Sequence, residues 1–199
     1  MKTDIAIYPT HVAAREAYTY KVRRTWRPNH ARCAWPWMIS CMEVKRPKEQ
    51  SGWWFPPGDA DDYRGTPPLI LLGDKAEAAR AQFIKYATEI MLRQHRTHLL
   101  AFYVDGPWVR AFRFDRAGCA VSEPFHVVCS RLLFPNLLFR LFCQSVEGQG
   151  LDSTVTLATR AELAKLESVA TDDPHFLEHR NRLLSEQRLY PVYKVRHGS

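Results

Sequence analysis

An acidic and a basic side chain stand two positions apart in Glu43-Val44-Lys45, at the end of a largely apolar run. That run, Met38–Met42, is typical of a β-strand, in which successive side chains point to opposite faces. We therefore expect Glu43 and Lys45 to share one face of a sheet and Val44 to point to the other. Asp4 belongs to a second strand-like segment near the N-terminus. If the two strands are neighbours, two carboxylates and one amine converge.

These residue types suit the binding of a divalent cation and the cleavage of a phosphodiester bond. Mg²⁺ prefers oxygen ligands, commonly one or two carboxylates together with waters and a substrate phosphate. We expect Asp4, Glu43 and the backbone carbonyl of Val44 to bind Mg²⁺ or Mn²⁺. Lys45 would orient the attacking water or stabilise charge on the phosphate. The alternative is that Glu43 and Lys45 form only an exposed ion pair on the surface of a strand, with no catalytic role.

The positive charge of the chain, +7, is concentrated near this candidate site. Residues 1–50 hold ten Lys or Arg against four Asp or Glu, whereas the rest of the chain is nearly neutral. A basic segment beside a metal site suits a polyanion, above all DNA, whose phosphates it would neutralise; the alternative is a solvated hairpin. The predicted nucleic-acid-binding residues are Arg15, Lys21, Arg23, Arg24, Arg27 and Arg32.

Composition narrows the class of protein further. No apolar run is long enough to span a bilayer, and the first residues lack the pattern of a signal peptide, so we expect no membrane partner. The five cysteines are an odd number without a Cys-x-x-Cys pair, which favours reduced thiols over disulfides or structural zinc. We expect an intracellular protein, nuclear or cytoplasmic.

Hydrophobic periodicity predicts an α/β fold with a mixed central sheet of four to six strands, flanked by helices. The expected strands are 2–8, 16–24, 37–45, 98–104, 108–114 and 119–123, and the expected helices are 76–96, 135–144, 160–169 and 174–184. Asp74 is the expected N-cap of the first helix, with Glu77 completing a capping box. The Pro- and Gly-rich segment 47–68 is expected to be a long loop that leaves the site and acts as a lid or clamp. We expect one domain over 1–150 and a C-terminal helical extension over 151–199.

The predicted helix 76–96 carries Gln82 and Tyr86 one turn apart on the same face. Together with Asp4 and Glu43-x-Lys45, this Gln-x-x-x-Tyr pair resembles the PD-(D/E)xK nuclease superfamily. The resemblance implies a restriction-endonuclease-like fold, metal-dependent hydrolysis of DNA, a positioning role for Gln82 and Tyr86, and action as a homodimer. Members normally carry a helix and a strand ahead of the Asp, whereas this sequence begins three residues before Asp4. We therefore expect a later element to complete the core, or a trimmed version of the fold.

A second resemblance covers more of the chain. It is to the region that precedes the kinase core in fungal-type protein kinases, and the end of the chain is similar to the lead-in to that core. The segments that carry it are Glu43–Lys45, Gln82–Met91, Arg96–His98, Asp105–Gly106, Phe114–Gly118, Val121–Phe125 and Leu189–Val195.

The catalytic motifs of a kinase are missing from the sequence. It contains no Gly-rich phosphate loop, no His-Arg-Asp and no Asp-Phe-Gly, so we do not expect kinase activity from this chain. The alternative to a nuclease is an inactive nuclease-like module that binds nucleic acid or regulates an attached kinase-like domain. In that case residues 151–199 pack on the nuclease-like domain or lead into the kinase-like one.

Overall fold

The computed structural model of the chain describes residues 3–19, 33–45, 51–56, 68–187 and 190–195. The strands are β1 (Ile5–Ile7), β2 (Ser40–Lys45), β3 (His98–Asp105), β4 (Trp108–Asp115), β5 (Cys119–Val121), β6 (Phe125–His126), β7 (Val155–Leu157) and β8 (Tyr193–Val195). The helices are α1 (Val12–Thr19), α2 (Asp74–Arg93), α3 (Leu133–Cys143), α4 (Arg160–Glu167) and α5 (Pro174–Glu186), with a short 3₁₀ helix, η1, at Trp35–Trp37. None of the helices in the described residues is long and apolar enough to cross a membrane.

The main sheet is mixed and has six strands, in agreement with the predicted α/β class. Its order is β1-β2-β3-β4-β5, and β6 pairs with the other end of β4. β2 and β3 are parallel and are joined through α2, whereas the other pairs are antiparallel. The C-terminal ends of β2 and β3 therefore lie side by side, and this edge carries the candidate site.

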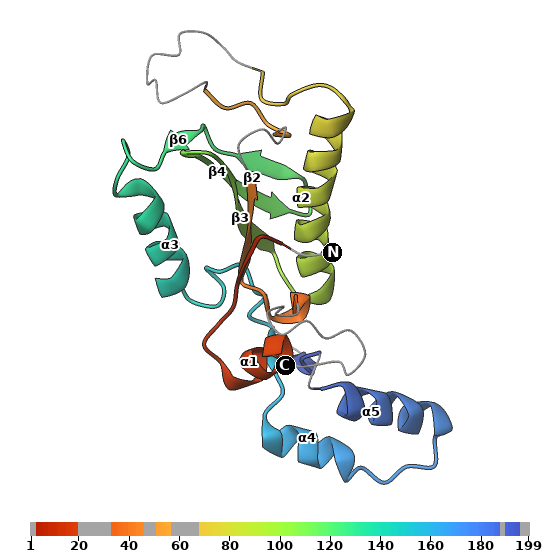
Figure 1. Ribbon diagram of the computed structural model, residues 1–199. Coiled ribbons are helices and arrows are strands. Elements are labelled where there is room, and N and C mark those ends of the chain that lie inside the picture. The colour runs from red at the N-terminus through yellow and green to blue at the C-terminus, as the bar shows by residue number, and fades with distance from the viewer. Residues whose placement is uncertain (1–2, 20–32, 46–50, 57–67, 188–189, 196–199) are drawn as a thin grey trace.

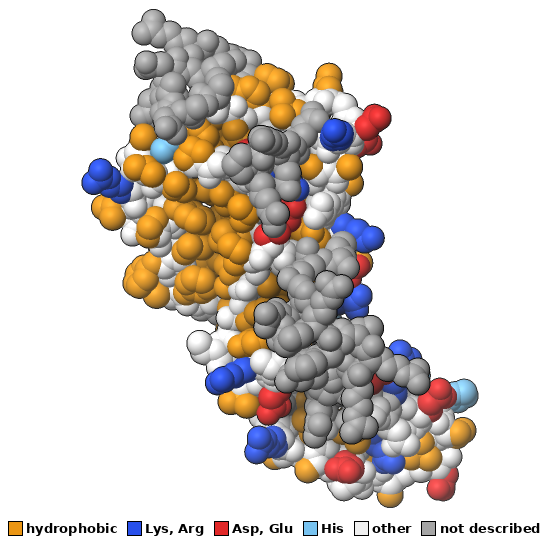
Figure 2. All heavy atoms as spheres, viewed as in Figure 1, with side chains coloured by type: hydrophobic (Ala, Val, Ile, Leu, Met, Phe, Trp, Pro, Cys, Tyr) orange, Lys and Arg blue, Asp and Glu red, His pale blue; other side chains and the backbone are white. Residues whose placement is uncertain are grey.

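Two helices cover the two faces of this sheet, α2 on one and α3 on the other (Figure 1). Side chains alternate along β3, so Leu99, Ala101 and Tyr103 pack on the α2 side while Phe102 packs on the α3 side. α2 fits this face because Phe83, Tyr86, Ala87 and Ile90 recur at helical spacing and are buried. On the α3 face of the sheet, hydrophobic side chains gather over α3 (Figure 2). Phe139 and Phe142 of this helix are exposed.

The C-terminal helices do not flank the main sheet, so that part of the sequence expectation is wrong. α4 and α5 pack against each other, and β7 pairs with β8 in a separate two-stranded sheet, beyond the end of the main sheet (Figure 1). Neither helix buries any residue fully, as expected for two helices that pack on each other outside the main core.

Buried Arg96 links the C-terminal part to the start of β2. Its guanidinium donates to the carbonyl oxygens of Gln149 (2.6 Å) and Met38 (3.1 Å) and to the side chain of Gln94 (2.7 Å). Burial lowers the pKa of Arg96 to about 10. These bonds satisfy a buried charge without a carboxylate.

The expected strand at 16–24 is also wrong where the structure describes it. Residues 12–19 form α1, and the remaining positions, 20–24, lie outside the described residues. Ala14 and Ala17 are buried three positions apart, on a helical face that packs near Trp37. Alanine favours a helix, and this contact between distant segments outweighs the β-propensity of Tyr18 and Thr19.

Helix α2 begins differently from the prediction. Gly73, with φ 105°, is the N-cap and makes no side-chain cap bond, so Asp74 is the first helical residue. Asp74 and Glu77 remain in the first turn, where acidic side chains interact favourably with the positive end of the helix.

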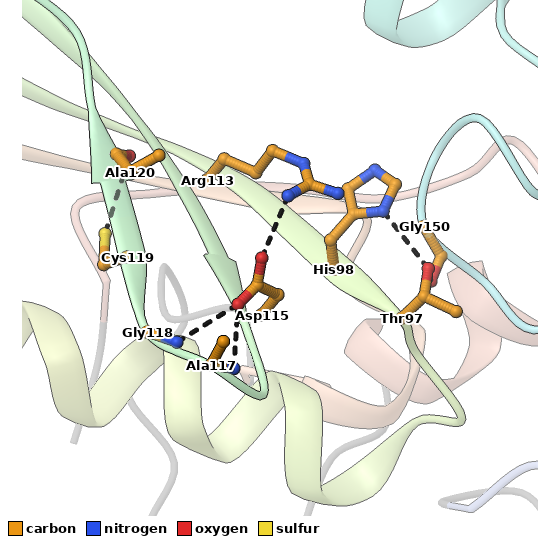
Figure 3. A network of polar contacts seen from close by, with 9 residues as sticks. All are labelled: Thr97, His98, Arg113, Asp115, Ala117, Gly118, Cys119, Ala120 and Gly150. Carbon is orange, nitrogen blue, oxygen red and sulfur yellow. Dashed lines mark hydrogen bonds and ion pairs between the residues drawn. The ribbon is translucent and has the colours of Figure 1, made fainter.

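The turn between β4 and β5 is closed by one aspartate (Figure 3). Asp115 Oδ1 accepts from the backbone N–H groups of Ala117 and Gly118, and its Oδ2 accepts from Arg113. This polar network therefore serves the turn and lies away from the candidate site.

Candidate functional site

The antiparallel pairing of β1 with β2 places Asp4 beside Glu43. Ile5 pairs with Met42, so the same register continued by one residue puts Asp4 opposite Glu43. Asp4 Oδ2 accepts a hydrogen bond from the backbone N–H of Val44 at 2.9 Å. That bond fixes the Asp4 carboxylate at the edge of β2, on the solvent-exposed side of the cluster.

Glu43 and Lys45 share the α2 face of the sheet, as strand alternation predicts. Lys45 Nζ donates to Glu43 Oε1 at 2.7 Å, and both side chains are largely buried, with 10% of Lys45 and 3% of Glu43 exposed. The second oxygen, Glu43 Oε2, is buried and accepts no hydrogen bond from a donor group among the described residues, and the Glu43 carboxylate lies within hydrogen-bonding range of the Asp4 carboxylate. The pair is thus not the exposed surface ion pair of the alternative interpretation.

The environment of Glu43 favours its protonated form. Burial raises the pKa of Glu43, the contact with Lys45 lowers it, and the neighbouring Asp4 carboxylate raises it again. Two carboxylates at close range without a shared cation repel each other. A bound dication would relieve this repulsion.

Gln82 and Tyr86 come to the same cluster from α2. The Gln82 amide donates to the Tyr86 hydroxyl, as expected for residues one turn apart. Burial raises the pKa of Tyr86, the bond from Gln82 lowers it, and the charges of Glu43, Asp4 and Lys45 also act on it. The Tyr86 hydroxyl therefore faces the acidic cluster, while its ring packs in the core and stacks on Trp35.

The other predicted site residues are placed less closely or not at all. Met42 packs on the α3 side of the core, so alternation along β2 places the Val44 side chain on that face too, as expected. A metal could use only the backbone carbonyl of Val44, because the side chain has no ligand atom. Arg15 lies on the exposed surface of α1. The other five predicted nucleic-acid-binding residues, at positions 21, 23, 24, 27 and 32, fall outside the described residues. The described residues contain no group of three or more His, Cys, Asp or Glu side chains suited to a metal.

Sequence analysis missed the residues on the neighbouring strand. β2 and β3 pair with Glu43 beside Tyr103 and Lys45 beside Asp105. The Lys45 ammonium lies 5.9 Å from the centre of the Tyr103 ring, and the Tyr103 hydroxyl accepts from the backbone N–H of Gly52 at 3.3 Å. No local pattern marks this contact, because it depends on the parallel register between two strands.

Residues 51–53, which follow β2, are buried next to the site and do not form an exposed surface loop. Ser51, Gly52 and Trp53 are buried, and Trp53 lies in the core among Phe83, Tyr103 and Phe112. This part of the expected 47–68 loop is therefore fixed structure, whereas residues 46–50 and 57–67 lie outside the described residues. The aromatic run at Trp53-Trp54-Phe55 was the available signal.

The fold and the site together define a mixed α/β protein with a half-buried acidic cluster at the ends of two parallel strands. A family model described as fungal protein kinase matches residues 72–189, more than half of the chain, and the chain belongs to that family. This confirms the family named in the second resemblance, for residues 72–189. Gln82, Tyr86 and Asp105 fall inside the matched range, whereas Asp4, Glu43 and Lys45 precede it. Neither the curated proteins nor the solved structures give a match to the chain.

Proposed function

We propose that the cluster of Asp4, Glu43 and Lys45 is a divalent-metal-dependent nuclease site that hydrolyses phosphodiester bonds of DNA, on a restriction-endonuclease-like core. The observation that carries the proposal is the close approach of two carboxylates, Glu43 and Asp4, where the buried Oε2 of Glu43 accepts no hydrogen bond from a donor group among the described residues. Burial of a carboxylate oxygen that accepts no hydrogen bond is unfavourable in free energy, so a cation bound to this oxygen would stabilise the site.

The donor set fits Mg²⁺ or Mn²⁺. Asp4 and Glu43 supply two hard carboxylate oxygens, and the Val44 carbonyl is a third candidate ligand. The other positions would be taken by waters and by the substrate phosphate, as is usual for Mg²⁺. Such a cation would neutralise developing charge on the phosphate and acidify a bound water.

The residues of the chain have distinct roles in the proposed reaction. Lys45, held by Glu43, donates to the attacking water or to a phosphate oxygen, which places the nucleophile and offsets negative charge. The water oxygen forms a new bond to phosphorus and gives up one proton to solvent, while the bond to one sugar oxygen breaks and that leaving oxygen takes up one proton from solvent. Gln82 and Tyr86 act as positioning residues, because the amide fixes the hydroxyl that faces the carboxylates.

The deciding experiment is a cleavage assay on plasmid and linear DNA with Mg²⁺ or Mn²⁺. Lys45→Ala and Glu43→Gln should each reduce the rate about 100-fold or more, as expected for removal of a group that acts on the reacting atoms. Lys165→Ala and Glu167→Gln, exposed on α4, are matched controls and should cleave like the wild type. The proposal fails if wild type and Lys45→Ala are equally inert, or if Glu43→Gln retains full metal-dependent activity.

A second candidate function is favoured by the family match. The chain belongs to a kinase family yet lacks the three kinase motifs, and the matched range runs through α2 into α5. A catalytically inactive module that binds nucleic acid or regulates an attached kinase-like domain would have this pattern. DNA binding without metal-dependent cleavage would favour this second function over the first.

A further inference from the structure

A cavity of about 330 Å³ opens on the α2 face of the sheet, beyond Lys45. Asp105, which pairs with Lys45 in the β2–β3 register, is one of its walls, so the cavity adjoins the proposed cleavage site. Its other walls are mostly apolar or aromatic. The lining residues are Ser51, Trp53, Trp54, Phe55, Pro56, Leu71, Gly106, Pro107 and Trp108.

The aromatic walls are held in place by contacts outside the cavity. Trp53 lies edge-on to Tyr103, with ring centroids 4.7 Å apart, and Phe55 stacks on Tyr103 at 6.1 Å. The Arg110 guanidinium lies 5.5 Å from the centre of the Phe55 ring and donates to the Trp54 carbonyl at 3.1 and 3.0 Å. The cavity is thus formed in advance, which lowers the entropy lost when a flat ligand enters.

The polar part of the cavity is a carboxylate beside an amine. Burial raises the pKa of Asp105, while the Ser51 hydroxyl and the Lys45 charge lower it. An ionised carboxylate only accepts hydrogen bonds, so a ligand here must present N–H or O–H donors at its edge. The neighbouring Lys45 disfavours a cationic ligand, which leaves a neutral, flat group with polar N–H edges as the best match.

We propose that this cavity binds one unpaired nucleobase of a single strand whose backbone passes Asp4, Glu43 and Lys45. The inference rests on the proposed function for the polymer, DNA, and for the path of its backbone. A base in a duplex is stacked on both sides and hydrogen-bonded at its edge, so it offers neither its faces to the aromatic walls nor its N–H groups to Asp105. The site therefore prefers single-stranded or locally opened DNA.

The test is equilibrium binding of fluorescently labelled 12-nucleotide strands in EDTA, where a metal-dependent site does not cleave. The probes are one thymine-rich strand with a single guanine, adenine or cytosine at its centre, the same strand with an abasic centre, and the matching duplex. Trp54→Ala should weaken binding of the base-containing strands about tenfold, which is the usual effect of losing one stacking contact between a base and an aromatic ring. The same variant should leave the abasic strand and the duplex unchanged. Asp105→Asn, which adds donors, should change the order of preference among the central bases.

The controls separate this effect from loss of fold. Phe139→Ala removes an exposed aromatic ring on α3, and Asp172→Asn removes an exposed charge between α4 and α5. Both should bind every probe like the wild type. Trp54→Phe keeps a stacking ring and should retain most of the affinity, so it decides the question if Trp54→Ala does not fold.

The possible outcomes also distinguish this inference from the proposed function. If Trp54→Ala weakens base-dependent binding and no protein cleaves DNA in Mg²⁺ or Mn²⁺, the base-binding cavity is supported and the nuclease proposal fails. If the protein cleaves DNA but wild type and Trp54→Ala bind all strands equally, the base-binding proposal fails and the nuclease proposal stands. The inference is also overturned if the duplex is preferred, if no strand binds, or if a proline-rich peptide competes for Trp54 better than DNA does.

Discussion

At the scale of single residues, Glu43 is a carboxylate buried at a cost in free energy that a bound cation would offset. Glu43 is 2% exposed. One carboxylate oxygen pairs with Lys45, while the other accepts no hydrogen bond from a donor group among the described residues. Removal of a carboxylate from water is unfavourable unless every oxygen finds a donor or a cation. A residue of this kind is expected where binding of a ligand offsets the cost.

The raised pKa of Glu43 predicts how stability depends on pH in the absence of metal. Because the folded pKa lies above the ordinary value, the folded protein holds a proton that the unfolded chain has lost within that window. The free energy of unfolding contributed by Glu43 should therefore fall as pH rises from the ordinary glutamate value through the raised one. Urea unfolding in EDTA between about pH 4 and pH 8 measures this slope.

The matched comparison is between two glutamate-to-glutamine changes. Glu43→Gln should flatten the slope, because the amide does not titrate. Glu89→Gln, in a partly exposed pair with Arg93 on α2, should leave the slope as in the wild type. Equal slopes in wild type and Glu43→Gln would contradict the assignment of a buried, proton-favouring carboxylate.

At the scale of elements, the segment 51–56 fixes the site between α2 and the sheet. Arg80 on α2 donates to the carbonyls of Gly52 and Leu71, and Trp54 N–H donates to the Leu69 carbonyl at 3.1 Å. Trp53 then fills the core beneath this segment. The position of the cavity walls therefore depends on how closely the segment approaches α2.

Gly52 is the point of closest approach, and its replacement gives a prediction for this element. A Cβ at this position would lie 2.5 Å from the Arg80 side chain and 2.9 Å from the Arg80 backbone nitrogen. The side chain can move but the helix backbone cannot, so Gly52→Ala should lower the free energy of unfolding by about 1–3 kcal/mol. Chemical denaturation followed by tryptophan fluorescence measures the loss.

Gly148→Ala is the control for Gly52→Ala. Its Cβ would lie 2.9 Å from the Cβ of exposed Gln144, and its three nearest neighbours include no backbone atom. Gly148→Ala should therefore lower the free energy of unfolding by less than Gly52→Ala, because no helix backbone opposes the new methyl group. If Gly52→Ala is equally mild, the 51–56 segment is not held tightly against α2.

At the scale of the whole molecule, the positively charged part of the chain and the part that matches the family lie in different segments. The fungal protein kinase match covers residues 72–189, whereas most of the positive charge lies in residues 1–50, ahead of it. The acidic cluster is assembled from both parts, with Asp4, Glu43 and Lys45 from the basic part and Gln82 and Tyr86 from the matched part. If DNA binds, its phosphates are expected to meet the basic part.

The salt dependence of DNA binding tests this expectation. Each phosphate neutralised on a single strand contributes about 0.7 to the slope of log affinity against log salt concentration. Replacement of Arg23, Arg24 and Arg27 by Ser should therefore reduce the slope by about 2. A triple change at exposed Arg131, Arg140 and Lys165 should not alter it. Equal slopes for the two triple variants would place the phosphate contacts elsewhere.

The sequence by itself determined the local structure and the α/β class. Periodicity predicted α2, β3, β4 and the three C-terminal helices to within a few residues, because the spacing of apolar residues in helices and strands can be read from a short stretch of sequence. Alternation along β2 likewise placed Glu43 and Lys45 on one face. Short strands such as β6 and β7 were missed, because two or three residues carry no repeat.

The tertiary structure alone decided which residues meet. The antiparallel β1–β2 register brings Asp4 to Val44, and the parallel β2–β3 register brings Tyr103 and Asp105 beside Glu43 and Lys45. The paired residues are 33 to 37 positions apart in β1–β2 and 60 apart in β2–β3, and no local pattern encodes such a register. The chemistry of each side chain is therefore fixed by sequence, whereas the composition of the acidic cluster and of its neighbouring cavity is fixed by strand pairing.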